Sequence, residues 1–302
     1  MAIRLRLLGT AAGGGLPQWN CACGNCQAAR RGEIPARTQS SVAISAEGEQ
    51  WFLVNASPDL RAQILATPEL WPKNASARNS PISGVLLTNA DLDHVLGLPL
   101  IREGQSLPVW ATDAVQETVT ESLHFDTLLG AFSGLRWHSA GLESFPLAAP
   151  DGSSIGLSVN TIFLPGPPPR FASSAQATTG HSVAYQITDA DGLRLLIAPD
   201  VAEITPELQR ALEQADAVLF DGTFWTDDEL RRLDPQARTA REMNHLPIES
   251  GSLDILSKIP ARWKIFTHIN NTNPILASDS PERALVEQAG LVVGEDGMEW
   301  AL

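Results

Sequence analysis

Several predicted strands of this chain end in, or begin with, side chains of the kinds that bind metals. The apolar run 84–88 (GVLLT) leads directly into NADLDH, which contains two carboxylates and an imidazole. In the same way, His181 opens HSVAYQI, Asp200 follows LLIAP, Asp221 follows AVLF and His268 follows KIFT. Because α/β folds collect ligand-binding groups at the carboxyl ends of buried strands, we expect these side chains to converge on one metal site.

Buried strands alternate with helices along most of the chain. Hairpins are predicted at 41–55 and 182–199, with further strands at 3–8, 84–88, 107–110, 155–164, 217–220 and 263–267. Helices are predicted at 58–66, 93–103, 112–123, 203–214 and 248–257. This alternation favours a layered α/β fold with a mixed sheet or two sheets. A dinucleotide-binding fold is disfavoured because AAGGGLPQ leads into cysteines and not into a phosphate-binding helix.

Composition limits the domain organisation and the partners. The 302 residues show no linker-like shift, low-complexity tract or fixed-period repeat, so we expect one domain spanning 1–302. A net charge of −14 repels phosphate backbones and anionic lipid heads, so no nucleic-acid or membrane partner is expected. The N-terminus lacks the continuous apolar core of a signal peptide, which favours a cytoplasmic protein. A homodimer is left open.

All three cysteines lie in one loop, at about 20–27, after the first predicted strand. Cys21, Cys23 and Cys26 form CxCxxC, a spacing that suits three thiolates on one tetrahedral Zn²⁺. An odd number of cysteines packed this closely does not form a set of structural disulfides. We therefore predict a structural zinc that orders the glycine-rich loop, with its fourth ligand supplied from elsewhere.

The metal-type residues resemble those of the metallo-β-lactamase superfamily, which implies an αβ/βα four-layer sandwich. Its hallmark is HxHxDH after a buried strand, then a strand-opening His, an Asp and a late His. The corresponding positions here are Asn89, Asp91, Asp93, His94, His181, Asp200 and His268. The first two histidines of the hallmark are thus replaced by Asn89 and Asp91.

The resemblance implies that one of two metal positions is retained. Asp93, His94, Asp200 and His268 occupy the ligand positions of the second metal, whereas Asn89 and Asp91 leave the first poorly suited to zinc. Two imidazoles with carboxylates and open positions match the ligands of non-haem Fe²⁺ oxygenases, while hydrolases of this kind favour two metals. We expect a single Fe²⁺, with Zn²⁺ or Mn²⁺ as alternatives. Asp91 and His181 are candidate additional ligands or catalytic groups.

A phosphodiesterase branch of the superfamily shares the CxCxxC motif and implies two further roles. Its zinc takes a histidine three residues after the last active-site histidine, and Asn271 stands at that position here. Asn271 is therefore a candidate fourth ligand, beside a nearby carboxylate, His268 or water. His245, in REMNHLP, matches an extra active-site histidine of that branch. It is a candidate general acid or base, or a group that holds substrate carboxylates.

A closer resemblance covers nearly the whole chain. The segments GTAAGGGLPQWNCACGNC, RTQSSVAIS, NASPDLRAQ, DGTFWTDDE, REMNHLPI and THINNTNPIL resemble the PqqB family of pyrroloquinoline quinone (PQQ) biosynthesis. This implies a small anionic substrate, either PQQ or a precursor derived from a cross-linked Glu–Tyr unit. The retained ligands favour an oxygenase that uses O₂ to hydroxylate the tyrosine-derived ring. The alternatives are a carrier for PQQ or its precursor, and a single-zinc hydrolase.

An anionic substrate requires local positive charge in an acidic protein. Arginines near the motifs are the candidates for this lining: Arg37, Arg61, Arg102, Arg170 and Arg241. The irregular region 124–180, with its run PGPPPR, is a candidate lid.

Overall fold

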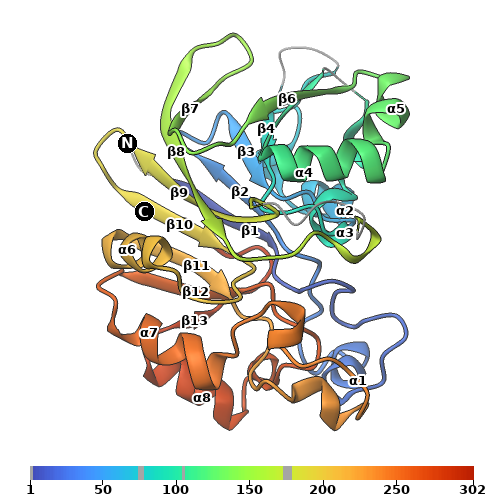
Figure 1. Ribbon diagram of the computed structural model, residues 1–302, viewed down its shortest axis with the longest axis vertical. Coiled ribbons are helices and arrows are strands. Elements are labelled where there is room, and N and C mark those ends of the chain that lie inside the picture. Colours follow the sequence, from blue (N-terminus) through green and yellow to red (C-terminus); the bar gives the residue numbers. More distant parts are fainter. Residues whose placement is uncertain (1–2, 74–77, 104–105, 173–178) are drawn as a thin grey trace.

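The buried strands form two mixed sheets of seven strands each in the computed structural model, which describes residues 3–73, 78–103, 106–172 and 179–302 (Figure 1). The first sheet has the order β14 (Glu299–Ala301), β1 (Arg4–Gly9), β2 (Ser41–Ser45), β3 (Trp51–Val54), β4 (Ile82–Leu86), β5 (Leu107–Ala111) and β6 (Leu135–Ser139). The second has the order β13 (Val292–Val293), β12 (Trp263–Thr267), β11 (Ala217–Asp221), β10 (Arg194–Ala198), β9 (Ser182–Asp189), β8 (Ser154–Leu164) and β7 (Phe145–Ala148).

Each sheet is antiparallel in one part and parallel in the other. In the first sheet β1, β2 and β3 pair antiparallel, whereas β3 to β6 run parallel. In the second, β7 to β10 pair antiparallel and β10 to β13 run parallel. The last strand, β14, returns to the first sheet and pairs antiparallel with β1, so the two ends of the chain lie side by side. Parallel strands bring their carboxyl ends to one edge, which is where the polar strand ends gather.

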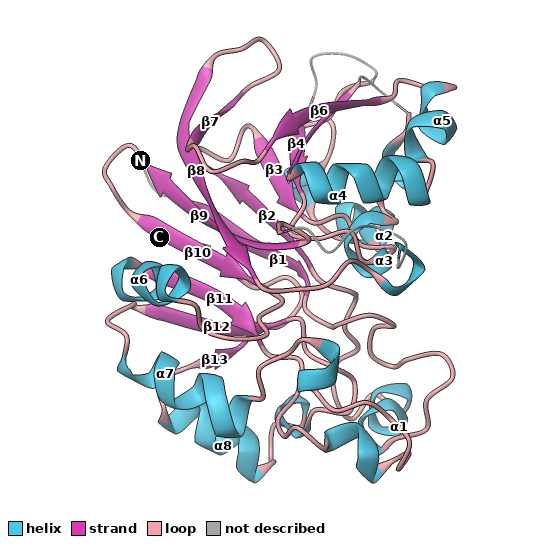
Figure 2. Cartoon of the chain, viewed as in Figure 1, coloured by secondary structure: helices cyan, strands magenta, loops and turns pink. Residues whose placement is uncertain are grey.

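Three separate hydrophobic cores define four layers. One core lies between the sheets and includes Leu5, Ile44, Ile197 and Leu219. A second packs the other face of the second sheet against α6 (Pro206–Gln214), α7 (Leu253–Lys258) and α8 (Pro281–Gln288). The third packs the first sheet against α2 (Leu60–Leu65), α3 (Leu92–Val95), α4 (Asp113–Glu117) and α5 (Phe125–Gly130). Figure 2 shows these helices outside the strands, and the predicted αβ/βα four-layer sandwich is confirmed.

The prediction of one helix over 93–103 is wrong, because the helix breaks at Gly97. A Cβ added at Gly97 would lie 2.4 Å from the carbonyl oxygen of Ser57, so only glycine allows this close approach. Pro99 follows, and the chain continues as a 3₁₀ turn at Leu98–Ile101. The predicted helices 112–123 and 248–257 are each part α-helix and part π-helix.

The region 124–180 is more regular than predicted. It contains α5, β6, β7 and the long strand β8, which was expected at 155–164. Residues 173–178 of the predicted lid lie outside the described part of the chain. The proline run itself does border the candidate site described below.

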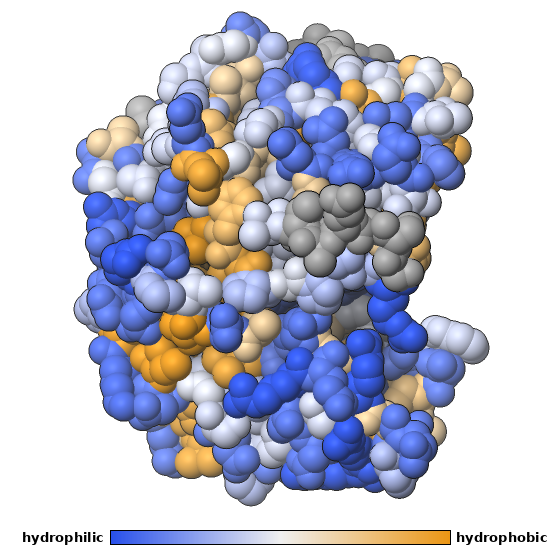
Figure 3. Space-filling model, viewed as in Figure 1, coloured by the Kyte–Doolittle hydropathy of each residue, from blue (hydrophilic) through white to orange (hydrophobic). Residues whose placement is uncertain are grey.

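The face of the molecule in Figure 3 is mostly hydrophilic, with hydrophobic surface in separate patches, in keeping with the net charge of −14. Among the described residues, no helix combines the length and the hydropathy that crossing a membrane requires.

Candidate metal sites

The polar strand ends of both sheets meet at a small cleft. The loop after β4 supplies Asn89 and Asp91, β9 is preceded by His181, and Asp200 follows β10. Together with His245 and the proline run 165–169, these residues line a cavity of about 60 Å³. Convergence of side chains from separate strands therefore occurs as predicted.

Two overlapping groups of ligand atoms lie beside this cleft. The ligand atoms of Asp93, His94 and His268 are all within 4.8 Å of one another, as are those of Asp200, His245 and His268. We call these five residues the carboxylate–histidine site. It brings together all four residues predicted to bind the active-site metal and adds His245, which was predicted only as an acid, base or substrate contact.

His94 provides the test of whether an ion fits. Its side chain is fully buried, and its Nε2 has no hydrogen-bond partner among the described residues. The Nε2 lies 3.7 Å from Asp93 Oδ2 and 3.6 Å from Asp200 Oδ2. Two donors at about 2.1 Å from one tetrahedral ion are roughly 3.4 Å apart. The buried lone pair and its spacing from two carboxylates therefore fit a shared cation.

His268 is held in an uncommon backbone conformation. Its φ is 54°, in the left-handed region that non-glycine residues rarely adopt. Its Nε2 lies 3.1 Å from Asp93 Oδ2, and its Nδ1 lies 3.6 Å from Asp200 Oδ1. Burial alone lowers the pKa of His268, but the carboxylates of Asp200 and Asp93 outweigh it and raise the pKa to about 10. The site thus strongly favours positive charge at this point.

Asn89 and Asp91 take different roles at the positions of the replaced histidines. The Nδ2 of Asn89 donates a hydrogen bond to Asp200 Oδ2 at 3.0 Å, and its Oδ1 accepts one from the backbone N–H of Asp91. Desolvation by the neighbouring groups, together with the carboxylates of Asp93 and Asp200, raises the pKa of Asp91 to about 6, although Asp91 is an exposed residue at the mouth of the site. Asp91 and His181 line the cleft, but neither belongs to the two groups of converging ligand atoms.

Asp221, expected as a further polar strand end, supports His245. Its fully buried Oδ2 lies 2.7 Å from Nδ1 of His245. Burial raises the pKa of Asp221, but His245 lowers it further, below its usual value. Burial in turn lowers the pKa of His245, yet the Asp221 carboxylate raises it overall. Asp221 and His245 therefore form a carboxylate–imidazole pair beside the cleft.

Sequence reasoning missed the threonines that hold the histidine rings. The Oγ1 of Thr88 lies 3.2 Å from His94 Nδ1, and that of Thr223 lies 2.9 Å from His268 Nδ1. Asn55, also in the left-handed region at φ 65°, donates from Nδ2 to Thr88 Oγ1. Both threonines come within two residues of a strand end, which is the one signal that could have indicated them.

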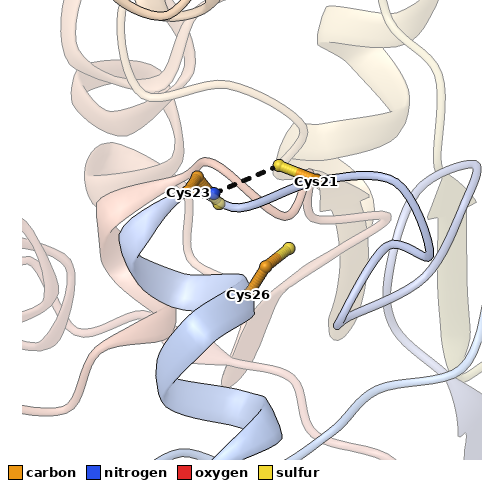
Figure 4. A group of neighbouring side chains, drawn as sticks. All are labelled: Cys21, Cys23 and Cys26. Carbon is orange, nitrogen blue, oxygen red and sulfur yellow. Dashed lines mark hydrogen bonds between the residues drawn. The ribbon is translucent and has the colours of Figure 1, made fainter.

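The three cysteines form a second candidate metal site, which we call the thiolate cluster (Figure 4). Cys21 precedes α1 (Gly24–Arg30), Cys23 is its N-cap and Cys26 lies within it. Their sulfur atoms lie within 4.8 Å of one another. Burial raises the pKa of Cys23 to about 11, with smaller contributions from the neighbouring thiols of Cys21 and Cys26. Three thiolates this close to one another would require a cation among them. The predicted ligand spacing is therefore present.

Asn271 occupies the fourth position of this cluster. Its Nδ2 lies 3.2 Å from the sulfur of Cys21, 3.5 Å from that of Cys23 and 3.2 Å from that of Cys26. The two ends of an amide are assigned from hydrogen bonding, and a half-turn would present Oδ1 to a cation. Three sulfurs and one amide thus fit the donor set of a Zn²⁺ ion, and Asn271 stays the candidate fourth ligand.

The predicted arginine lining is wrong for Arg37. Its side chain is 3% exposed and donates to the carbonyl of Gly294 and to Thr10 Oγ1, so it serves the structure. No arginine is among the described residues that line the cleft. Arg170 directly follows the lining residue Pro169, and Arg241 lies two residues before the lining residue Met243. In contrast, Arg102 pairs with Glu103 and Arg61 is exposed.

Glu229 joins the loops that follow β11 and β12. One oxygen accepts the backbone N–H of Trp225 at 2.6 Å and the other accepts the hydroxyl of Thr272. Glu229 is 5% exposed, and burial raises its pKa from 4.5 to about 7. A carboxyl group whose pKa is higher in the folded state stabilises the fold when protonated. That stability is lost as pH rises from about 4.5 to about 7.

A Glu229→Gln variant tests this dependence. Glutamine keeps one acceptor oxygen for the N–H of Trp225, can donate its NH₂ to the hydroxyl of Thr272 and cannot ionise. The variant should therefore gain roughly 2–3 kcal/mol relative to the wild type between pH 5 and pH 8. Urea unfolding at both pH values measures the difference, with Glu249→Gln at an exposed position as the control. If the free energy of unfolding changed equally with pH in Glu229→Gln and in the wild type, the raised pKa of Glu229 would be contradicted.

Comparisons with known proteins agree with this geometry. Residues 50–269 match the β-lactamase superfamily domain model. The chain is 40% identical to coenzyme PQQ synthesis protein B of Cupriavidus taiwanensis over 305 residues, 99% of each chain, and 42% identical to that of Methylobacterium nodulans over 300 residues, 97% of each. The crystal structure of Zn²⁺-bound PqqB from Methylobacterium extorquens is 40% identical and superposes with a TM-score of 0.90, covering 99% of this chain and 100% of that one.

A diphosphatase of the PhnP family shares the fold alone, with 19% identity and a TM-score of 0.69 over 100% of this chain and 98% of the other. The full-length relatives are far more similar, at 40–42% identity over nearly the whole chain. The chain belongs to the PqqB family of the metallo-β-lactamase superfamily.

Proposed function

We propose that the chain acts in PQQ biosynthesis as a metal-dependent oxygenase. Its substrate is a small anionic precursor derived from a cross-linked Glu–Tyr unit, and O₂ hydroxylates the tyrosine-derived ring. The observation that carries this proposal is the hydrogen bond from Asn89 to Asp200. An amide at that position takes the place of one histidine ligand of a two-metal hydrolase, while Asp93, His94, Asp200 and His268 remain together.

The proposed ion is Fe²⁺ held by these four residues. When bound, such an ion supplies the activation of O₂ that oxidation of a phenol ring requires. Overall, one oxygen atom of O₂ replaces a ring hydrogen and becomes a hydroxyl group, and the other leaves as water. The two electrons and two protons come from a two-electron reductant such as ascorbate.

His245 has a defined proton-transfer role in this proposal. Its Nδ1–H donates to Asp221 Oδ2 at 2.7 Å, which leaves Nε2 as the atom that can accept a phenol proton. The Asp221 carboxylate stabilises the imidazolium that results. His181 and Asp91 line the cleft and would contact the substrate. The proline run 165–169 also lines the cleft and would exclude water from the bound substrate.

Isotope incorporation tests the function. The protein is purified without oxygen, loaded with Fe²⁺ and given the cross-linked Glu–Tyr precursor, ascorbate and ¹⁸O₂. We expect a product that carries one ¹⁸O atom as a hydroxyl group on the tyrosine-derived ring. Protein loaded with Zn²⁺ should give no such product. Tight binding of the precursor or of PQQ without any product would favour the carrier. Turnover of a generic phosphodiester by the Zn²⁺ form would favour the single-zinc hydrolase.

A further inference from the structure

Thr223 lies between the two histidine systems of the carboxylate–histidine site. It follows β11, is 3% exposed and is not among the described residues that line the cleft. Its hydroxyl lies 2.6 Å from Asp221 Oδ1 and 2.9 Å from His268 Nδ1. One hydroxyl group therefore touches both the carboxylate that holds His245 and the ring of His268.

The direction of these hydrogen bonds follows from the surroundings of Asp221. Its Oδ2 accepts from the backbone N–H of Val201 and from His245, and its Oδ1 accepts from the backbone N–H of Thr223. The hydroxyl of Thr223 has one proton and two neighbouring oxygens that only accept, Asp221 Oδ1 at 2.6 Å and the carbonyl oxygen of His268 at 2.9 Å. The charged and nearer acceptor is Asp221, so the proton points to its carboxylate. The hydroxyl oxygen is then left to accept from Nδ1–H of His268, and Nε2 of that ring faces Asp93.

Thr223 also supports the backbone of His268. Its carbonyl accepts the N–H of Asn270 at 3.1 Å, and the N–H of the preceding Gly222 donates to the carbonyl of Thr267 at 2.8 Å. These contacts lie on either side of a residue in the left-handed conformation. Such a conformation persists only where the surrounding structure holds it in place.

We propose that Thr223 is a positioning residue that transmits the orientation set by Asp221 to His268. One buried carboxylate thus orients two imidazoles, His245 directly and His268 through the threonine hydroxyl. Both rings then present Nε2 away from Asp221. The part of this inference that concerns metal affinity rests on the proposed function.

The second buried histidine of the site has a matching arrangement. Nδ1 of His94 faces the hydroxyl of Thr88, which is itself held by the amide of Asn55. In both histidines of the Asp93–His94–His268 group, Nδ1 therefore contacts a threonine hydroxyl. Partners of this kind set which ring nitrogen is free and typically change metal affinity by about 10- to 100-fold.

Thr223→Val and Thr223→Ser test the proposal, with Thr267→Val as the matched control. Valine keeps the shape and removes the hydroxyl, and serine restores the hydroxyl. Thr267 is also fully buried and adjoins His268, but its hydroxyl has no hydrogen-bond partner among the described residues. Two readouts are compared: the Co²⁺ dissociation constant of the carboxylate–histidine site by chelator competition, and the Nδ1–H signal of His268 in metal-free protein with ¹⁵N-labelled histidine.

Thr223→Val should weaken Co²⁺ binding at least about 10-fold, and it should shift the Nδ1–H signal and speed its exchange with water because the hydroxyl acceptor is gone. Thr223→Ser and Thr267→Val should keep both close to the wild type. An Nδ1–H signal of unchanged shift and exchange rate in Thr223→Val, or unchanged affinity, would overturn the proposal. If the wild type binds no Co²⁺ at this site but the Nδ1–H signals behave as expected, the proposed function fails and the positioning role stands. Thr223→Ala serves the same comparison if the valine variant does not fold.

Discussion

Replacing both His94 and His268 with alanine is expected to empty the carboxylate–histidine site while the thiolate cluster keeps its metal. The two rings are the buried nitrogen donors of the Asp93–His94–His268 group. Loss of a group that merely supports a ligand already costs about 10- to 100-fold in metal affinity. Removal of two ligands should therefore leave no bound ion at micromolar metal.

Metal analysis after anaerobic purification measures this result. We expect one equivalent of metal in each site of the wild type and only the thiolate-bound equivalent in the double variant. His124→Asn is a suitable control, because His124 has φ 56° and asparagine tolerates that left-handed conformation. Equal metal content in the double variant and the wild type would mean that the carboxylate–histidine site does not hold an ion.

Cys26→Ala is expected to release the metal of the thiolate cluster and to lower stability. Cys26 is fully buried in the core beside the second sheet, and its sulfur accepts from the backbone N–H of Gln18 and from Asn271. An ion present at about 1,000 times its dissociation constant contributes roughly 4 kcal/mol to folding. The variant should lose a stabilisation of that order.

Thermal unfolding and zinc content check this prediction in Cys26→Ala and in wild type treated with a chelator. The two should have similar unfolding temperatures, both below that of the untreated wild type. Asn271→His should keep its zinc and resist the chelator longer, because imidazole is a stronger zinc ligand than an amide. An unfolding temperature of the wild type that does not respond to chelation would rule out a stabilising metal in the cluster.

The positions of the metal-type residues were largely predictable because they follow buried strands. An apolar run such as 84–88 identifies its strand without any knowledge of the partner strands. The side chains directly after it must then lie at the sheet edge, and Asp93, His94, Asp200 and His268 do so. Spacing within CxCxxC likewise implied a common site, because short chain segments leave few arrangements.

Other features depend on contacts that a sequence does not reveal. The requirement for glycine at position 97 arises from the backbone of Ser57, a residue from a different loop. Helix α1 buries Cys26 as its one fully buried side chain, so it has no apolar periodicity. Arg37 looked available for substrate, but the distant residue Gly294 binds it. Asp221 had the right position for a ligand, and only the location of His245 shows that it orients an imidazole.

The carboxylate–histidine site lies where the two sheets meet, and each half of the chain supplies part of it. Asp93 and His94 come from the first half, whereas Asp200, His245 and His268 come from the second. An ion bound there is therefore also a non-covalent cross-link between the halves. Its release lowers the free energy of opening along this seam without changing either sheet. In protein short of metal, the first detectable change should then be faster proteolysis at the loops after β4, β10 and β12. This change should precede any loss of secondary structure.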